Sequence, residues 1–477
     1  MNPQLDHAIQ NLRLNSVRYG KTERYYTGDH DIAFATEKFQ SAFGSLFRQF
    51  ALYLCPAICD AIRDKLKITG FGIQSKSYAF TRESTLRIND SQAQSPSETT
   101  PKGVTLTETI DHIWRLNRMS LRSGEIHKEA LKNGDAYAIV WYGPNGEPAI
   151  YPQRAASCTV QYDEEDPGRI AWAAKHWRTP DGRTRLNLFY PDRIERYITR
   201  KAGDSLLPDA KDFVEFGMRS AEREMKNAET ETDEFRTPHS AIRNPFNVVP
   251  VFHFANNADL GQPGQSELRD AVPIQDGLNK SVLDMLVAME YSAFRQRWVA
   301  GIELQTDETS GQAVEPYKAG IDRLWVASAP EARFGDFSAT DLEQFLKVKD
   351  SFRVDMASVT GTPLHYFLQN TRGFASGEAL RKVETRFLAK VRDRQESFGQ
   401  TWSDLMSFAL RLTGHEGVDL ITNWDDPAPI ADSERLQNIL LKKQLGVSTE
   451  QALKEAGYGD LDIRRMLKEQ PRSETRP

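Results

Sequence analysis

The chain has 477 residues, more than one hydrophobic core usually supports, so we expect several subdomains. Hydrophobic residues make up 39% and charged residues 27%, as in ordinary globular proteins. A net charge of -6 and a pI near 6.0 argue against a protein that wraps nucleic acid over its whole surface. They leave room for a protein that contacts DNA with a local ring or stripe of charge.

The three cysteines, Cys55, Cys59 and Cys158, cannot all pair with one another, and no disulfide framework is predicted. Cys55 and Cys59 lie four residues apart in a helical pattern, so we expect buried core thiols rather than metal ligands. The N-terminus has no signal pattern, and polar residues and a proline interrupt the longest apolar stretch, 43–62. We therefore expect a soluble protein without a membrane span.

Helical patterns dominate the first part of the chain. The apolar pattern predicts helices over residues 1–70, and the Ser- and Thr-rich composition of residues 74–104 predicts a loop. Thr105-Leu-Thr-Glu108 is a capping box, whose side chains satisfy free backbone N–H groups at a helix start. An apolar helical stripe then continues to Leu131.

From Asp135 the apolar period changes to two, which predicts strands. Residues 135–142, the turn 143–146 and a strand at 149–151 form a hairpin signal. Further strands are predicted at 158–162, 169–177, 185–190 and 194–200. Together these segments predict one antiparallel β meander over 135–200 that packs on helices. The fold class is therefore α+β and mainly helical.

Residues 201–240 lose this periodicity and are interpreted as a solvated, partly helical excursion. Order returns with a buried strand within 244–254. A helix is then predicted from Ser266 that could reach Trp298, a length of about 48 Å at about 1.5 Å per residue.

A compact insert follows at 301–337, with strand-like stretches at 302–304 and 324–326. Beyond it, the sequence predicts a helix that opens on the capping box Thr340-Asp-Leu-Glu343 and stops at Gly361. Its apolar stripe comprises Leu342, Phe345, Leu346, Phe352, Met356 and Val359.

A second helix is predicted from near Ser376 to Gly414. One face carries an apolar stripe: Leu380, Val383, Phe387, Leu388, Val391, Phe398, Trp402, Leu405, Met406 and Ala409. The other face is basic: Arg381, Lys382, Arg386, Lys390, Arg392 and Arg394. The connecting loop is long for a compact domain, so it is either functional or a plain surface loop of a helical hairpin.

No enzyme motif is found, and no cofactor is predicted. There is no phosphate-binding P-loop, no dinucleotide fingerprint and no H-E-x-x-H pair. Asp192 and Glu195 match a metal-dependent nuclease pattern faintly, but the second acidic residue and the lysine of such a site are missing. A nuclease remains the alternative from the enzyme class.

The C-terminal part predicts two short helices, the second capped by Ser448-Thr-Glu-Gln451. The segment 445–459 resembles a helix-turn-helix DNA reader, but few basic residues lie on its second helix to contact phosphates. We prefer a structural helical cap, with a DNA-binding regulator as the other alternative.

Five motifs and their order resemble the portal proteins of tailed bacteriophages of the siphophage type, over roughly residues 20–460. The motifs are Tyr25-Tyr-Thr-Gly-Asp-His; Asn133-Gly-Asp-Ala-Tyr with Trp141; Asn244-Pro-Phe-Asn-Val-Val-Pro-Val; Gly264-Gln-Ser-Glu-Leu with Gln275-Asp-Gly-Leu-Asn-Lys; and Thr360-Gly-Thr-Pro with Ala375-Ser-Gly-Glu-Ala-Leu. Two features depart from the family pattern, namely the excursion at 201–240 and a short C-terminal segment.

The resemblance implies a portal fold that assembles into a ring of about twelve subunits around a central channel for double-stranded DNA. Its implied parts are a wing (1–260), a stem helix (261–300), a clip (301–337), a second stem helix (338–360), a tunnel loop (361–377), a long wing helix (378–414) and a crown (415–477).

The same resemblance assigns roles to residues of the tunnel loop. The side chains expected to face DNA are His365, Tyr366, Gln369, Asn370, Arg372 and Phe374. The expected hinges are Gly361, Gly373 and Gly377, because glycine is the residue least restricted in φ.

The implied location is the capsid portal vertex of a virion assembled in the host cytoplasm. The implied partners are non-specific double-stranded DNA, the terminase large subunit, a head–tail adaptor, and the major capsid and scaffolding proteins.

Overall fold

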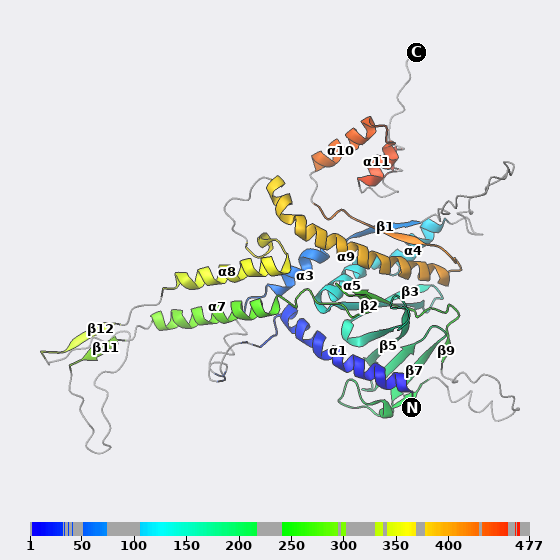
Figure 1. Cartoon of the computed structure of the whole chain (residues 1–477). Coiled ribbons are helices and arrows are strands. Elements are labelled where there is room, and N and C mark those ends of the chain that lie inside the picture. Colours follow the sequence, from blue (N-terminus) through cyan, green and yellow to red (C-terminus); the bar gives the residue numbers. More distant parts are fainter. Residues whose placement is uncertain are drawn as a thin grey trace, which may run out of the picture.

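The structure is a computed structural model of the chain. It describes residues 2–31, 33, 37, 41, 51–73, 105–216, 241–293, 297–301, 330–336, 341–368, 377–428, 432–456, 463 and 465–467. The described chain holds helices and antiparallel sheets, and within it the strands over residues 135–255 follow one another without an α-helix between them, which confirms the α+β class (Figure 1).

A six-stranded antiparallel sheet lies near the N-terminal helix. Its strands are β4 (Cys158–Tyr162), β5 (Ile170–Arg178), β6 (Thr184–Phe189), β7 (Arg193–Thr199), β8 (Phe213–Glu215) and β9 (Ile242–Arg243), with β8 and β9 both paired to β7. Helix α1 (Pro3–Thr27) lies along one face of this sheet (Figure 1). Its buried Leu5, Ile9 and Leu12 pack there against residues such as Trp172 and Leu188.

A second sheet contains β2 (Asp135–Tyr142), β3 (Pro148–Gln153) and β10 (Val251–Ala255) in the order β10-β2-β3. The single meander predicted over 135–200 is therefore wrong. The hairpin β2–β3 pairs with the distant β10 instead of β4, and the two sheets pack face to face. Tyr137 and Ile139 of β2 bury against Ala173 and Phe189 of the six-stranded sheet.

The main core lies on the other face of β2, where helices cover it. These helices are α3 (Cys55–Arg63), α4 (Leu106–Leu116), α5 (Met119–Asn133) and α9 (Gly377–Leu412). The apolar stripe predicted on α9 is buried from Phe387 to Ala409, and the Thr105 capping box is present. Both cysteines of α3 are free and buried, as predicted.

The sequence analysis missed one strand pair. β1 (Ile68–Ile73) pairs with β13 (Leu420–Trp424), so segments from both ends of the chain meet beside α9. In its described part, residues 201–216, the excursion folds back onto the sheet and contributes β8 to it, which the sequence analysis did not predict. Leu207, Ala210 and Phe213 are buried against α1 and its neighbours.

Two antiparallel helices project from this body as a hairpin (Figure 1). They are α7 (Val272–Ala293) and α8 (Glu343–Thr360), and a two-stranded sheet of β11 (Arg297–Ala300) and β12 (Arg333–Asp336) lies beyond them. We call this unit the stem hairpin.

The predicted single helix from Ser266 to Trp298 is wrong at both ends. Residues 267–271 form turns before α7, and Trp298 belongs to β11. The strands predicted at 302–304 and 324–326 lie outside the described residues. Helix α8 begins at Glu343, whose amide N–H donates to the Asp341 carboxylate, while Thr340 lies outside the description.

Two short helices, α10 (Asp432–Gln444) and α11 (Thr449–Glu455), follow the body as predicted. The backbone N–H of Gln451 donates to the Ser448 hydroxyl, as expected for a helix cap.

Close packing within the stem hairpin gives a stability prediction. A Cβ placed on Gly277 would lie 2.8 Å from the Phe352 ring of α8. We expect Gly277→Val to destabilise the protein by about 1–3 kcal/mol through overpacking. The control is Gly124→Val in α5, where no neighbouring atom lies within 4 Å of the added Cβ. Equal chemical-denaturation midpoints for the two variants would contradict the proposed close crossing.

Candidate functional site

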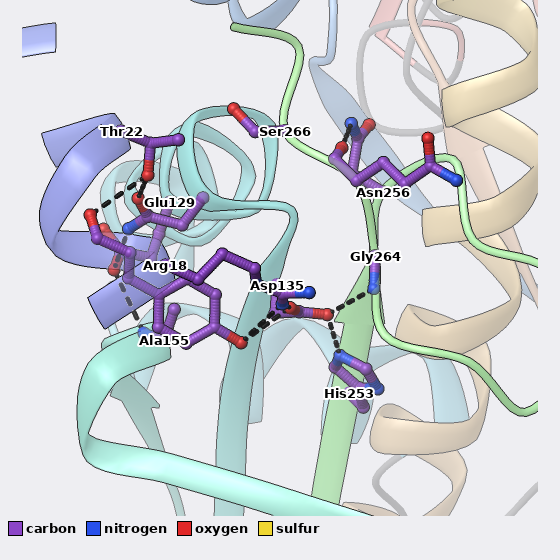
Figure 2. A network of polar contacts seen from close by, with 12 residues as sticks. Arg18, Thr22, Glu129, Asp135, Ala155, His253, Asn256, Gly264 and Ser266 are labelled. Atoms are coloured by element: carbon purple, nitrogen blue, oxygen red, sulfur yellow. Dashed lines mark hydrogen bonds and ion pairs between the residues drawn. The ribbon is translucent and has the colours of Figure 1, made fainter. Parts of the chain in front are cut away.

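Among the described residues, Asp135, the first residue of β2, has polar contacts with four other residues. Its carboxylate is fully buried and accepts hydrogen bonds from the Tyr19 hydroxyl (2.6 Å), His253 Nε2 (2.8 Å) and the Gly264 backbone N–H (2.6 Å). Arg18 forms an ion pair with it. Figure 2 shows these groups converging from α1, β10 and the loop after β10.

The environment keeps this carboxylate charged. Burial alone would raise the pKa of Asp135, but the hydrogen bonds from His253, Tyr19 and Gly264 outweigh burial and lower the pKa below its usual value. The Tyr162 hydroxyl lies 2.8 Å from His253 Nδ1. Together with the hydrogen bond from His253 Nε2 to Asp135, this contact forms a chain Tyr162–His253–Asp135.

Two glycines allow the backbones to cross beside Asp135. A Cβ on Gly264 would lie 1.9 Å from the carbonyl oxygen of Gly134, so only glycine fits there. Gly134 itself has φ +96°, a conformation that favours glycine. The crossing is closed by a hydrogen bond of 2.8 Å from the Asn256 N–H to the Gly134 carbonyl.

A second polar group surrounds the end of α5 (Figure 2). The Thr22 hydroxyl donates to the Asn133 side chain at 2.6 Å, and Glu129 accepts from the backbone N–H of Ala155. The buried Lys132 ammonium is paired with Glu23 and Glu129 at 2.5 and 3.0 Å. These contacts fix α1 against α5.

Helix α7 is tied to the body by side-chain amides. Gln275 accepts from the Leu54 N–H at 3.0 Å and donates to the Leu52 carbonyl at 2.7 Å, so it pairs with that backbone as a strand would. The next residue, Asp276, accepts from the Tyr25 hydroxyl at 2.7 Å. The stem hairpin is thus anchored at its inner end.

Glu267 forms a third buried centre. Its side chain is only 6% exposed and pairs with Lys390 and with Arg394 of α9, the latter at 3.0 Å. Burial would raise the pKa of Glu267, but the two cations hold it below the usual value. Lys390 also donates to the Thr360 carbonyl at 3.0 Å, at the C-terminal end of α8. These groups line a polar cleft of about 370 Å³.

Together, these contacts bring residues of three of the five sequence motifs into one junction, which we call the polar junction, and Thr360 of a fourth motif accepts a hydrogen bond from its Lys390. It comprises Arg18, Tyr19, Tyr25, Lys132, Asn133, Asp135, His253, Asn256, Gly264, Glu267, Gln275, Asp276, Lys390 and Arg394. The sequence analysis used several of these residues as motifs without assigning them contacts. The available signal was the position of charged and amide residues at the ends of apolar strands and helices.

The structure describes only the two ends of the predicted tunnel loop. Gly361 ends α8 with φ +67°, and Gly377 begins α9. His365 and Tyr366 lie in a short 3-10 turn near α9. Their side chains are partly buried, whereas we expected them to be exposed and to face DNA. His365 lies 3.4 Å from the Glu384 carboxylate, and the Tyr366 ring is 5.8 Å from that of Phe387. Gln369, Asn370, Arg372, Gly373 and Phe374 lie outside the described residues.

The nuclease alternative gains no support from the described residues. Within the described ranges, no group of three or more His, Cys, Asp or Glu side chains is arranged to hold a metal ion. Asp192 and Glu195 are both paired with Arg193. Likewise, no described helix is long and apolar enough to cross a membrane.

The buried charge of Asp135 predicts a pH dependence. Because its pKa is lower in the folded protein, Asp135 stabilises the fold above about pH 4–5, and this contribution is lost as the pH falls further. We expect Asp135→Asn to cost about 3–5 kcal/mol at neutral pH, since it breaks a buried ion pair. In this variant, the free energy of unfolding should also fall less steeply as the pH is lowered.

The matched control is Asp209→Asn, which removes an exposed carboxylate paired with Arg13. This change should have far less effect, because exposed ion pairs contribute little. Urea denaturation measured along a pH series checks both variants. Equal losses for the two would refute the importance of the junction.

Comparisons with known proteins agree with the sequence motifs. The chain is 28% identical to the portal protein of Mycobacterium phage D29 over 236 residues, which is 47% of each protein. It is also 28% identical to that of Mycobacterium phage L5 over 204 residues, 41% of this chain and 40% of that protein. The matches therefore span about half the length or less of these curated relatives.

Two solved structures show distant similarity. The neck of an empty GTA particle matches with a TM-score of 0.40 and 13% identity, over 71% of this chain and 78% of that one. A native gene transfer agent virion matches with a TM-score of 0.37 and 11% identity, over 71% and 80%.

The family model of the phage portal proteins of the SPP1 Gp6-like type matches residues 73–475, well over half of the chain. This family is structural rather than enzymatic. The chain belongs to the SPP1 Gp6-like family of phage portal proteins.

Proposed function

We propose that the chain assembles into a closed ring at one capsid vertex, through which double-stranded DNA is packaged and later ejected. The observation that carries this proposal is the uncovered apolar surface of the stem hairpin. On α8, Leu346, Val348, Val354 and Val359 are each between 44% and 48% exposed. A helix that projects from the body with such a surface needs a partner.

The exposed side chains lie on two flanks of α8. Leu346 and Val354 are about two turns apart on one flank, and Val348 and Val359 are about three turns apart on another. A subunit in a cyclic ring contacts one neighbour on each side through two different surfaces. Two apolar flanks on one helix suit this arrangement, with about twelve copies in a ring of the family type.

In this proposal the stem hairpin surrounds the channel, and the clip at 301–337 binds the terminase large subunit and then the head–tail adaptor. The wing at 1–260 contacts the capsid and scaffolding proteins, and 415–477 forms the crown.

Lys390 and Arg394 of α9 are paired with Glu267, so they are not available for tight phosphate binding. Weak binding lets DNA slide.

The tunnel loop is proposed to contact the moving DNA through Gln369, Asn370, Arg372 and Phe374. The support is positional, because both ends of the loop are attached to α9. Lys390 donates to the Thr360 carbonyl at one end, and the loop leads directly into Gly377 at the other.

Ring assembly is tested with Leu346→Glu/Val354→Glu. We expect the wild-type protein to sediment as a closed oligomer and the variant as smaller species, because charge on one flank blocks the contact with a neighbour. The control, Leu206→Glu/Leu260→Glu, changes two exposed leucines in loops by the same charge and should still form rings. Far-UV circular dichroism checks folding. A wild-type monomer at micromolar concentration, or intact rings of the stem variant, would refute the proposal.

The loop is tested with Gly373→Pro. Proline removes backbone freedom and should stiffen the loop, so rings form but the packaged DNA per particle falls. The control is Gly373→Ala, which changes the side chain at the same position without locking φ as proline does, and should package more DNA than Gly373→Pro. Full-length DNA retained by the Gly373→Pro variant would make the loop a passive connector.

A further inference from the structure

The six-stranded sheet has a face that is only partly covered. Along one row across its strands lie Cys158, Lys175, Asn187 and Arg196, and the Arg196 carbonyl accepts from the Phe216 N–H. At one end of this face, Ala173, Phe189 and Ile194 pack against β2 and β10. Beyond that contact, the face carries cations.

Three cations share this region with two aromatic rings. Arg185 lies on the same face as Lys175, two residues along β6 from Asn187, and pairs with Trp177 across the strands. Its guanidinium is 4.3 Å from the Phe216 ring centroid, and that of Arg196 is 5.9 Å from the same centroid. The Lys175 ammonium lies 5.1 Å from the Trp177 ring. We call Lys175, Arg185 and Arg196 the cationic face.

These charges have no local compensation. In the part of the chain that the structure describes, no carboxylate lies within ion-pair distance of the three cations. The Nε atoms of Arg185 and Arg196 are buried without a hydrogen-bond partner. Burial lowers the pKa of Lys175, as expected for an ammonium group in contact with protein but without an opposite charge. A bound anion would relieve this cost.

We infer that the cationic face binds phosphate groups of double-stranded DNA on the outside of the ring channel, without reading sequence. The inference relies on the proposed function only for the identity of the polyanion. It goes further by locating a second DNA contact on the wing, away from the stem hairpin and the tunnel loop.

The arrangement favours a phosphate backbone for two reasons. Lys175 and Arg196 are two strands apart, about 9–10 Å, so a row of separate anions fits them better than one small ion. Two guanidinium groups on one ring also present planar donors that match phosphate oxygens. The rings themselves are covered by cations, so they are not free to stack on bases, and contact to the duplex backbone remains.

The test compares wild type with Lys175→Gln/Arg185→Gln/Arg196→Gln in binding a mixed-sequence DNA duplex over a series of salt concentrations. Each phosphate-contacting cation contributes about 1 to the slope of log K against log salt, so the variant slope should fall by about 3. The charge-matched control is Arg13→Gln/Arg63→Gln/Arg169→Gln, whose side chains are already paired with aspartates. Its slope should equal that of wild type.

A second measurement needs no variant. DNA should slow the labelling of Lys175 by an amine-specific reagent, while the exposed Lys211 is unaffected. An unchanged slope in the triple variant, unprotected Lys175, or binding of poly-glutamate as tight as that of DNA would each overturn the inference. Ring formation is scored separately by electron microscopy, so a failure of the ring proposal is distinguished from a failure of the cationic face.

Discussion

A buried carboxylate is tolerated only when donors replace the water it has lost, and this constraint organises the molecule. Asp135 takes its donors from α1, β10 and the loop after β10, and Glu267 takes its charged donors from α9, beside an amide donor from Asn256. Apart from Asn256, these partners are more than a hundred residues away in sequence. Neither charge can be buried until the distant segments have met, so the two sites favour one arrangement of wing, stem hairpin and long helix over other compact states.

Local patterns predicted much of the fold because they depend on neighbours in sequence. The strands at 158–162, 170–178, 184–189 and 193–199 and the stripe of α9 follow from alternation and helical period. The pairing of β2 with β10, and of β1 with β13, was not predictable in the same way. Such pairs join segments more than a hundred residues apart, and no local pattern specifies the partner.

The polar junction, too, could be predicted only in part. The motif residues were visible in the sequence, but their convergence depends on Gly134 and Gly264 crossing at backbone contact distance. A glycine in a sequence does not reveal which segment will approach it. The same holds for the residues predicted to face DNA. The sequence located His365 and Tyr366 in the loop, but their contacts with Glu384 and Phe387 of α9 depend on the tertiary structure.

The anchoring of α7 has a mechanical consequence. Its inner end is fixed by Gln275, whereas its 22 residues extend over about 33 Å at about 1.5 Å per residue. The stem hairpin therefore behaves as a cantilever. A rotation of about 5° at the fixed end displaces the far end of such a 33 Å arm by about 3 Å. Small changes in hydrogen bonding inside the body are thus amplified at the tip, and a load applied to the tip acts with leverage on the amides that hold the base.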